Sequence, residues 1–132
     1  MKIILIVILF ALTTMQSFAQ ADIKQIEDLI AQNKNHITYR LFPTQNMWTF
    51  IKLNTRNGQM WQVQYGMKIE NLLVTDLNSV ALVSKDKEVN DKFTLYPTQN
   101  IYTFILIDQI DGKTWQVQWS IDTLNRAVIP IE

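Results

Sequence analysis

The sequence predicts an all-β fold, in which a short N-terminal helix precedes eight antiparallel strands arranged as two pseudo-symmetric four-stranded meanders. Three observations lead to this prediction: an internal repeat, segments rich in β-branched and aromatic residues, and an Asx-Gly turn in each copy. One copy of about 45 residues is too small to be stable alone, so the two copies should share a core. They could form a barrel, a sandwich or a pair of blade-like sheets. A barrel or a sandwich is favoured because either buries the apolar central strands.

The repeat consists of two blocks that recur 54 residues apart without a gap between them. Residues 41–51 (LFPTQNMWTFI) return as 95–105 (LYPTQNIYTFI), and WQVQY at 61–65 returns as WQVQW at 115–119. From Tyr39 onward, 13 of the 27 aligned positions are identical. The other positions have diverged, which indicates that the retained ones were held by some constraint.

The N-terminal residues have the three parts of an export signal. Lys2 is followed by an unbroken apolar run at 3–12, and Ser17 and Ala19 are small residues placed for cleavage before Gln20. Cleavage two residues later fits the same rule. The apolar run is too short to span a hydrocarbon core of about 30 Å. We therefore expect a periplasmic or secreted protein with no membrane span after cleavage.

The mature chain should be one domain. Removal of the signal peptide at 1–19 leaves about 113 residues, enough for one core. We expect a single β domain at 20–132, with its repeats at about 37–84 and 92–131. The stretch at 84–92 is charged and aperiodic, which predicts a surface loop between the repeats.

A short helix is expected before the first strand, over 22–34. Ile23, Ile26, Leu29 and Ile30 form one apolar stripe at helical spacing. Asp22 is a suitable N-cap, and asparagines around 33–35 favour a stop. We expect this helix to cover the core, with a partner-binding helix as the alternative.

Each copy should contain four strands. The second strand of each copy is apolar on both faces, which predicts a central strand buried on two sides. The third strand of each copy alternates aromatic or valine residues with glutamines. The first strand of each copy ends at a proline, Pro43 or Pro97. The fourth strands resemble each other at an offset of 47, so the first copy would carry about seven extra residues within 67–77. The expected strands are 38–42, 48–54, 61–65 and 78–83 in the first copy, and 92–96, 102–108, 115–119 and 125–130 in the second.

The core should be built from equivalent residues of the two copies. We therefore expect replacement of Trp61 or Trp115 by alanine to destabilise the domain severely and to a similar extent. The expected core residues are Phe50, Ile51, Trp61, Val63, Phe104, Ile105, Trp115 and Val117.

The composition excludes several functional classes. Twelve basic and twelve acidic residues cancel, and loss of Lys2 with the signal leaves 11 − 12, or −1, so a strongly basic nucleic-acid binder is excluded. The absence of cysteine excludes disulfides, thiolate metal sites, thiol catalysis and a lipid-anchor cysteine. The single histidine, His36, has no clustered metal ligands near it, and no GxSxG motif is present. We expect no enzyme activity, cofactor or metal.

The segment at 108–113 (DQIDGK) has the spaced acids of a calcium loop, but its counterpart at 54–59 (NTRNGQ) lacks both acids. We therefore interpret both segments as Asx-capped hairpin turns. With Trp115, the second segment also resembles, over about eight residues, the hairpin of quinoprotein-type β-propeller repeats, which has Asp-x-x-x-Gly-Lys and then a Trp further along. Trp115 lies one residue earlier than in that pattern. Two copies cannot close a ring of blades, and we infer no function from the resemblance.

Two groups of side chains are candidates for ligand binding. The duplicated Pro-Thr-Gln-Asn loops lie between aromatic residues, and amides beside aromatic faces suit sugars or extended peptides. Glutamines repeated on one strand face form the second group. The alternative for the loops is a purely structural turn, and for the glutamines the solvated side of a sheet. The candidates are Gln45, Asn46, Trp48, Gln62, Gln64, Gln99, Asn100, Tyr102, Gln116 and Gln118.

These observations predict an exported, non-catalytic binding module whose ligand is a glycan or another extracytoplasmic protein. The alternative is a structural or inhibitory protein that docks a partner through a sheet face. A hydrolase is the least favoured class. The identity of the ligand and the oligomeric state remain open at this stage.

Overall fold

The structure is a computed structural model that describes residues 20, 22–31 and 37–132. The chain divides into two compact units, 1–36 and 37–132. In the first unit, residues 22–31 are helical as predicted, and the side chains of the apolar stripe are exposed. That this helix covers the core stays a prediction. The expected signal peptide, the expected helix stop and His36 lie outside the described residues.

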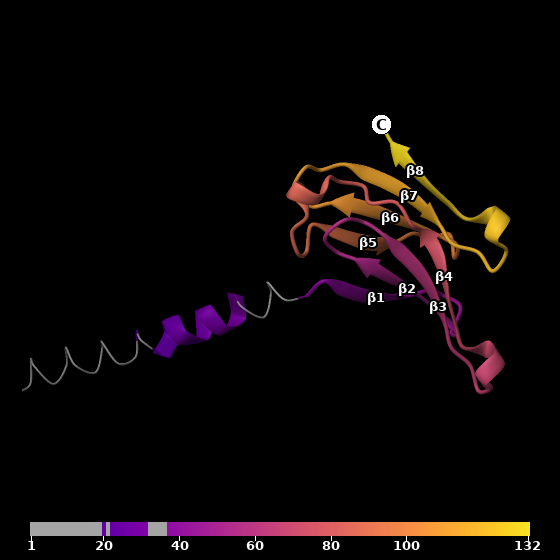
Figure 1. Cartoon of the computed structure of the whole chain (residues 1–132), viewed down its shortest axis with the longest axis horizontal. Helices are drawn as coiled ribbons and strands as arrows, with labels where there is room; N and C mark the ends of the chain where they lie inside the picture. Colours follow the sequence, from indigo (N-terminus) through magenta and orange to yellow (C-terminus); the bar gives the residue numbers. More distant parts are fainter. Residues whose placement is uncertain (1–19, 21, 32–36) are drawn as a thin grey trace, which may run out of the picture. The chain divides into compact units, whose positions relative to one another are not determined.

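The second unit consists of two open antiparallel sheets of four strands each, in the orders β1-β2-β3-β4 and β5-β6-β7-β8 (Figure 1). The predicted pair of meanders is therefore confirmed, and the sheets do not close into a barrel. β1, β4, β5 and β8 are the edge strands. The elements are β1 Tyr39–Pro43, β2 Thr49–Asn54, β3 Met60–Gln64, η1 Ile69–Asn71, β4 Leu73–Asn78, η2 Lys85–Lys87, β5 Phe93–Pro97, β6 Thr103–Asp108, β7 Thr114–Gln118, η3 Thr123–Asn125 and β8 Ala127–Ile131.

The fourth strand of the first repeat lies earlier than the predicted 78–83, so that prediction was wrong. β4 and β8 begin 54 residues apart, and the two copies therefore align through their fourth strands without an insertion. Val74 pairs with Val63 in the first sheet as Val128 pairs with Val117 in the second. Asn78 ends β4, because its Nδ2 donates to the carbonyl oxygens of Gly58 and Val80 and its Oδ1 accepts from the Val80 N–H.

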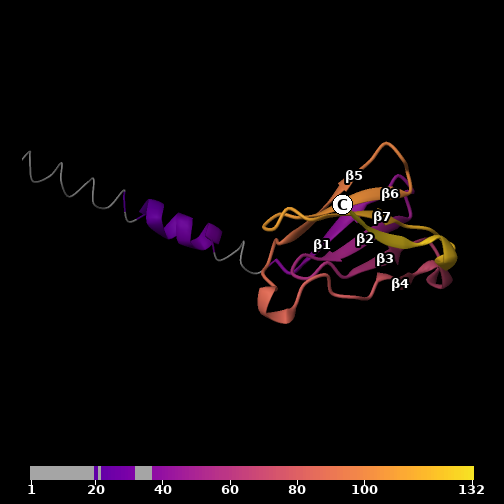
Figure 2. The same cartoon turned by 90° about the horizontal axis from the view of Figure 1, so that it is seen from above.

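The two sheets bury opposite faces of the same repeat. In β2 the buried side chains include Ile51 and Leu53, whereas in β6 they include Phe104 and Leu106. Phe104 corresponds to Phe50, one residue out of phase with Ile51. The face that the first sheet buries therefore packs against the opposite face of the repeat in the second sheet. Successive propeller blades pack in the same way. Figures 1 and 2 show the β5–β8 sheet lying over the β1–β4 sheet.

This stacking explains why only half of the predicted core was correct. Ile51, Phe104, Trp115 and Val117 are buried as expected. The other four expected residues are only half-buried and lie on the outer faces, so the central strands are buried on one side and not on two. The four outer residues are Phe50, Trp61, Val63 and Ile105. The core residues are Ile51, Leu53, Met60, Leu77, Phe93, Leu95, Phe104, Leu106, Trp115, Val117 and Trp119.

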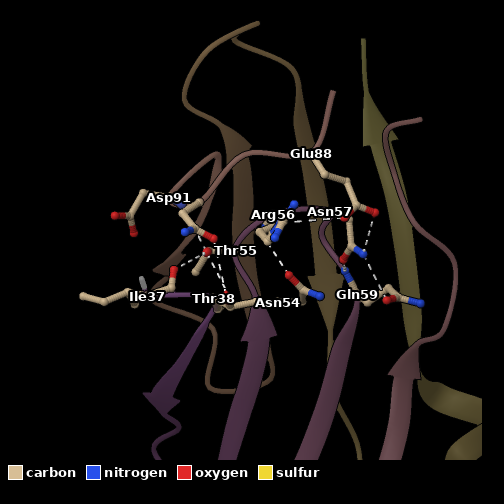
Figure 3. Close-up of polar contacts among 10 residues, drawn as sticks. Ile37, Thr38, Asn54, Thr55, Arg56, Asn57, Gln59, Glu88 and Asp91 are labelled. Carbon is tan, nitrogen blue, oxygen red and sulfur yellow. Dashed lines mark hydrogen bonds and ion pairs between the residues drawn. The ribbon is translucent and has the colours of Figure 1, made fainter. Parts of the chain in front are cut away.

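The segment that joins the repeats is anchored to the β2–β3 turn of the first repeat (Figure 3). Asn57 Nδ2 donates to Glu88 Oε1 at 3.2 Å, and Thr55 Oγ1 accepts from the Asp91 N–H at 3.1 Å. Gly58 has a φ of +79°, and a Cβ there would lie 2.7 Å from Leu82 Cδ1. Only glycine therefore fits both the turn and the close approach of the linker.

Candidate functional site

The Pro-Thr-Gln-Asn loops are hydrogen-bonded turns in both repeats. Thr44 Oγ1 donates to the Thr49 carbonyl oxygen at 2.8 Å, and Asn46 Oδ1 accepts from the Trp48 N–H at 2.9 Å. Thr98 and Asn100 make the equivalent bonds in the second repeat, at 2.9 Å each. The threonine and asparagine thus have a structural role, because each satisfies backbone groups of its own loop.

The glutamines of these loops are in a different situation. Gln45 and Gln99 are exposed, and neither side chain forms a hydrogen bond within the part of the chain that the structure describes. The two loops meet between the repeats, where Gln45, Pro97 and Asn100 are among the residues that line a hollow of about 300 Å³. Of the predicted loop candidates, Gln45 and Asn100 are therefore brought together in this hollow.

Tyr102 lines two hollows that together form a candidate site. Its ring is 48% exposed and packs 5.4 Å, centroid to centroid, from the buried ring of Trp119. The Trp119 Nε1 donates to the Ile101 carbonyl oxygen at 3.0 Å, which fixes this support. Gln45 and Asn46 line one hollow beside the pair, of about 310 Å³, and Gln118 lines a second, of about 320 Å³. We call this arrangement the Tyr102 site; its lining residues are Gln45, Asn46, Ile101, Tyr102, Gln118, Trp119, Ser120, Ile121 and Asn125.

The first repeat contains a corresponding hollow of about 460 Å³ around Trp48. Trp48 packs 5.3 Å from Tyr65, as Tyr102 packs on Trp119. Six of its lining residues are repeat equivalents of those lining the second hollow of the Tyr102 site. We call it the Trp48 site; its lining residues are Trp48, Gln64, Tyr65, Gly66, Met67, Lys68, Glu70 and Asn71.

The strand glutamines do not form one surface, because the sheets bury opposite faces. Gln62 is buried between the sheets, where its Oε1 accepts from the Ser120 N–H at 3.0 Å. Its equivalent, Gln116, is exposed on the outer face of the second sheet. Gln64 and Gln118 reach the Trp48 and Tyr102 sites, respectively, and Gln118 Nε2 donates to the Asn125 carbonyl oxygen.

An exposed aromatic surface on the outer face of the first sheet was not predicted from the sequence. Tyr39 and Trp61 lie 6.3 Å apart there, and the Lys52 ammonium group lies 4.6 Å from the Trp61 ring centroid. The available signal was the cross-strand neighbour of each tryptophan. Trp61 lies opposite Lys52, whereas its repeat equivalent Trp115 lies opposite Leu106. A lysine beside a tryptophan is typical of a half-exposed cation–π contact and not of a core.

A buried charged cluster was also missed, since Lys92 was expected in a surface loop. Lys92 is 2% exposed, and its Nζ lies 3.0 Å from Asp108 Oδ2 and 2.9 Å from Asp111 Oδ2. Asp108 Oδ1 accepts from the N–H groups of Ile110 and Asp111, which confirms the predicted Asx turn. The first repeat has the neutral residues Thr38, Asn54 and Asn57 at the three equivalent positions.

These contacts set the protonation of the cluster. The hydrogen bond to Asp111, opposed by burial and then reinforced by Asp108, raises the pKa of Lys92. Burial alone would raise the pKa of Asp108, but the backbone N–H groups and Lys92 together lower it below 3.8. Both partners are therefore charged at neutral pH, and the cluster is an internal ion pair that fixes the β6–β7 turn to the start of β5.

Comparison with family models, curated proteins and solved structures gives no match to this chain. Within residues 20, 22–31 and 37–132, no three acidic, histidine or cysteine side chains are grouped as metal ligands. Over the same residues, no helix has the length and apolarity needed to cross a membrane.

Proposed function

We propose that the protein is an exported, non-catalytic binding module that holds a saccharide at the Tyr102 site. The observation that carries this proposal is the half-exposed Tyr102 ring, which is supported from behind by Trp119 and flanked by amide side chains. A sugar ring has an apolar face that packs on an aromatic ring and hydroxyl groups that exchange hydrogen bonds with amides.

The amides around the ring come from both repeats. Gln45 and Asn46 belong to the first repeat, and Gln118 belongs to the second. Asn46 uses its Oδ1 and Gln118 its Nε2 within the chain, so Asn46 Nδ2 and Gln118 Oε1 are the groups each can offer a ligand. Gln45 offers both ends of its amide. This set supplies donors and two acceptors around one aromatic platform, which favours a polyhydroxylated ligand over an extended apolar one.

The experiment is binding of the purified exported chain to a glycan array. Tyr102→Ala and Gln45→Ala should each reduce binding of the retained glycan at least about tenfold, which corresponds to the loss of roughly 1.4 kcal/mol. Leu124→Ala is the matched control, because Leu124 is exposed near this end of the sheet but lines neither hollow. Absence of glycan binding, or equal loss in the control, would exclude the Tyr102 site.

A second candidate function is docking of a protein partner through the outer face of the first sheet. Its support is the exposed aromatic surface of Tyr39 and Trp61, which is larger than the single exposed apolar residues normal on a domain surface. Phe50 and Tyr65 extend this surface, with ring centroids 6.0 Å apart. Loss of partner binding on Tyr39→Ala, with glycan binding intact, would favour this function.

Export is part of the proposal and has its own test. Mass analysis of the N-terminus of the protein outside the cytoplasm should give a chain that begins at Gln20, or two residues later. Retention of Met1 would remove both the periplasmic or secreted location and the extracytoplasmic ligands.

A further inference from the structure

Within residues 37–132 no element covers the outer face of either sheet, and both faces carry exposed apolar side chains among polar ones. On the first sheet, Leu41 is 59% exposed, in one cross-strand row with Lys52 and the half-buried Trp61. On the second sheet, Ile129 is 53% exposed, in one cross-strand row with the half-buried Ile105. A β-strand with apolar residues on both sides is typical of a sheet that is covered on both sides. The fold therefore leaves two faces whose composition suits burial.

Each outer face is the repeat equivalent of one inner face. The outer face of the first sheet corresponds to the inner face of the second, with Leu41, Phe50, Trp61 and Val63 identical to their buried counterparts. The outer face of the second sheet corresponds to the inner face of the first, with Thr103, Ile105 and Gln116 identical to theirs. The interface inside the chain joins these same two kinds of face. The outer face of the first sheet is therefore complementary to the outer face of the second sheet. Neither outer face is complementary to a second copy of itself.

We infer that copies of this chain associate head to tail, with the outer face of the second sheet packed on the outer face of the first sheet of the next copy. One polar contact of the internal interface has matching groups at the new one, and another, from Arg126 Nη1 to the Asp76 carbonyl oxygen, has none, because Leu72 is the repeat equivalent of Arg126. Gln62 Oε1 accepts from the Ser120 N–H inside the chain, and Gln116 Oε1 would accept from the Gly66 N–H of the neighbouring copy in the same way. A head-to-tail contact of this kind closes into a ring when its rotation permits. Propellers typically contain about 4–8 sheets, so a ring would hold about two to four copies.

The contact between copies would also add to the Trp48 site the loop glutamine that the Tyr102 site receives from the other repeat. That this glutamine would bind a ligand rests on the proposed function. Inside the chain, Gln45 of the first repeat lies in one hollow with Tyr102 and Ile121 of the second. The equivalent arrangement between copies places Gln99 of one chain beside Trp48 and Met67 of the next. Association would thus make two complete sites per chain where a single copy has one.

One substitution between the repeats opposes the contact and supplies a test. Lys52 stands where the buried face of the second sheet has Leu106, and its ammonium group lies over Trp61. Burial of this lysine weakens the contact between copies relative to the internal one. Lys52→Leu should therefore tighten association about tenfold or more.

The decisive experiment is sedimentation velocity of the purified exported chain, with one blocking variant for each face. The unaltered chain should sediment as two to four copies, and Leu41→Arg or Ile129→Arg should each be monomeric. Mixed together, the two variants should form a one-to-one dimer, because each retains the face that the other has lost. Leu124→Arg is the control, since Leu124 is 90% exposed and lies outside both sheet faces. A monomeric unaltered chain, or a blocked pair that does not dimerise on mixing, would overturn the inference.

Cross-linking tests the geometry without any ligand, because the chain contains no cysteine of its own. A bismaleimide should join Gln99→Cys on one chain to Met67→Cys on another. The matched intrachain pair, Gln45→Cys with Ile121→Cys, reports the same arrangement inside one copy. Oligomers without the interchain product would overturn the proposed register. Association with no glycan binding would overturn only the proposed function.

Discussion

At the scale of single residues, the Lys92–Asp108 pair shows how one repeat carries charges where the other carries neutral groups. Lys92→Thr leaves Asp108 buried without its main cation and should cost about 3–5 kcal/mol of unfolding free energy. Lys92→Thr with Asp108→Asn reproduces Thr38 and Asn54 of the first repeat, and should cost less than Lys92→Thr alone. Urea denaturation of the variants measures the coupling, and purely additive losses would contradict it.

The same pair predicts a dependence of stability on pH. Because the pKa of Asp108 is lowered on folding, its contribution is present above its ordinary pKa of 3.8 and is lost as the pH falls through the lowered value. The difference in unfolding free energy between the unaltered chain and the Lys92→Thr, Asp108→Asn variant should therefore shrink below pH 3.8. Denaturation at a series of acidic pH values checks this, and a difference that stays constant would refute it.

The loop amides separate structure from recognition. Asn46→Ala and Asn100→Ala each remove the acceptor of a backbone N–H and should cost about 0.5–2 kcal/mol. Gln45→Ala and Gln99→Ala remove no bond within the described chain and should leave the melting temperature nearly unchanged. Thermal melts of the four variants decide this, and equal destabilisation by all four would make the motif a turn only.

At the scale of elements, the repeat-equivalent tryptophans should respond differently. Trp115 is 8% exposed in the core, so Trp115→Ala should cost about 3–5 kcal/mol. Trp61 is half-buried on the outer face, and Trp61→Ala should cost about 0.5–2 kcal/mol. The measurement is denaturation in the Ile129→Arg background, which removes contacts between copies. Equal losses would mean that both sheets bury the same face.

The elements also show what could be predicted from the sequence. The strands of the well-matched blocks were predicted because hairpin turns and proline ends are local signals. β4 was misplaced because 78–83 resembles a strand in composition, while the Asn78 side-chain bonds that end β4 are visible only in space. The inverted burial of Ile51 and Ile105 has no signal in these two identical residues themselves, and the available signal was the Lys52 that stands where the second repeat has Leu106.

In the candidate site, too, the features with a local sequence signal were predicted and those that depend on packing were not. The aromatic and amide residues of the loops were found because both copies retain their pattern, and Gln45, Asn46 and Tyr102 do meet in one hollow. Gln62 was misassigned because its burial depends on which face the second sheet covers. Trp119, the support of Tyr102, was not among the candidates because alternation alone assigns it to the core.

At the scale of the whole molecule, the two repeats should unfold together. Their core is one cluster with residues from both sheets, and the linker is held to the first repeat by Thr55 and Asn57. In the Ile129→Arg monomer, urea transitions followed by far-ultraviolet circular dichroism and by tryptophan fluorescence should therefore coincide. Separate transitions would show that one repeat is stable alone, against the size argument.

The edge strands bear on how the protein avoids aggregation. A free strand edge is a template on which further strands can pair, and charged residues and prolines block that pairing. Here the edges carry Arg40 and Pro43 on β1, Asp76 on β4, Pro97 on β5 and Pro130 on β8. Recruitment of foreign strands along the backbone is thus discouraged at all four borders, while the broad sides of the sheets stay open. A protein so arranged can meet copies of itself face to face, while strand-to-strand pairing into a fibril is discouraged.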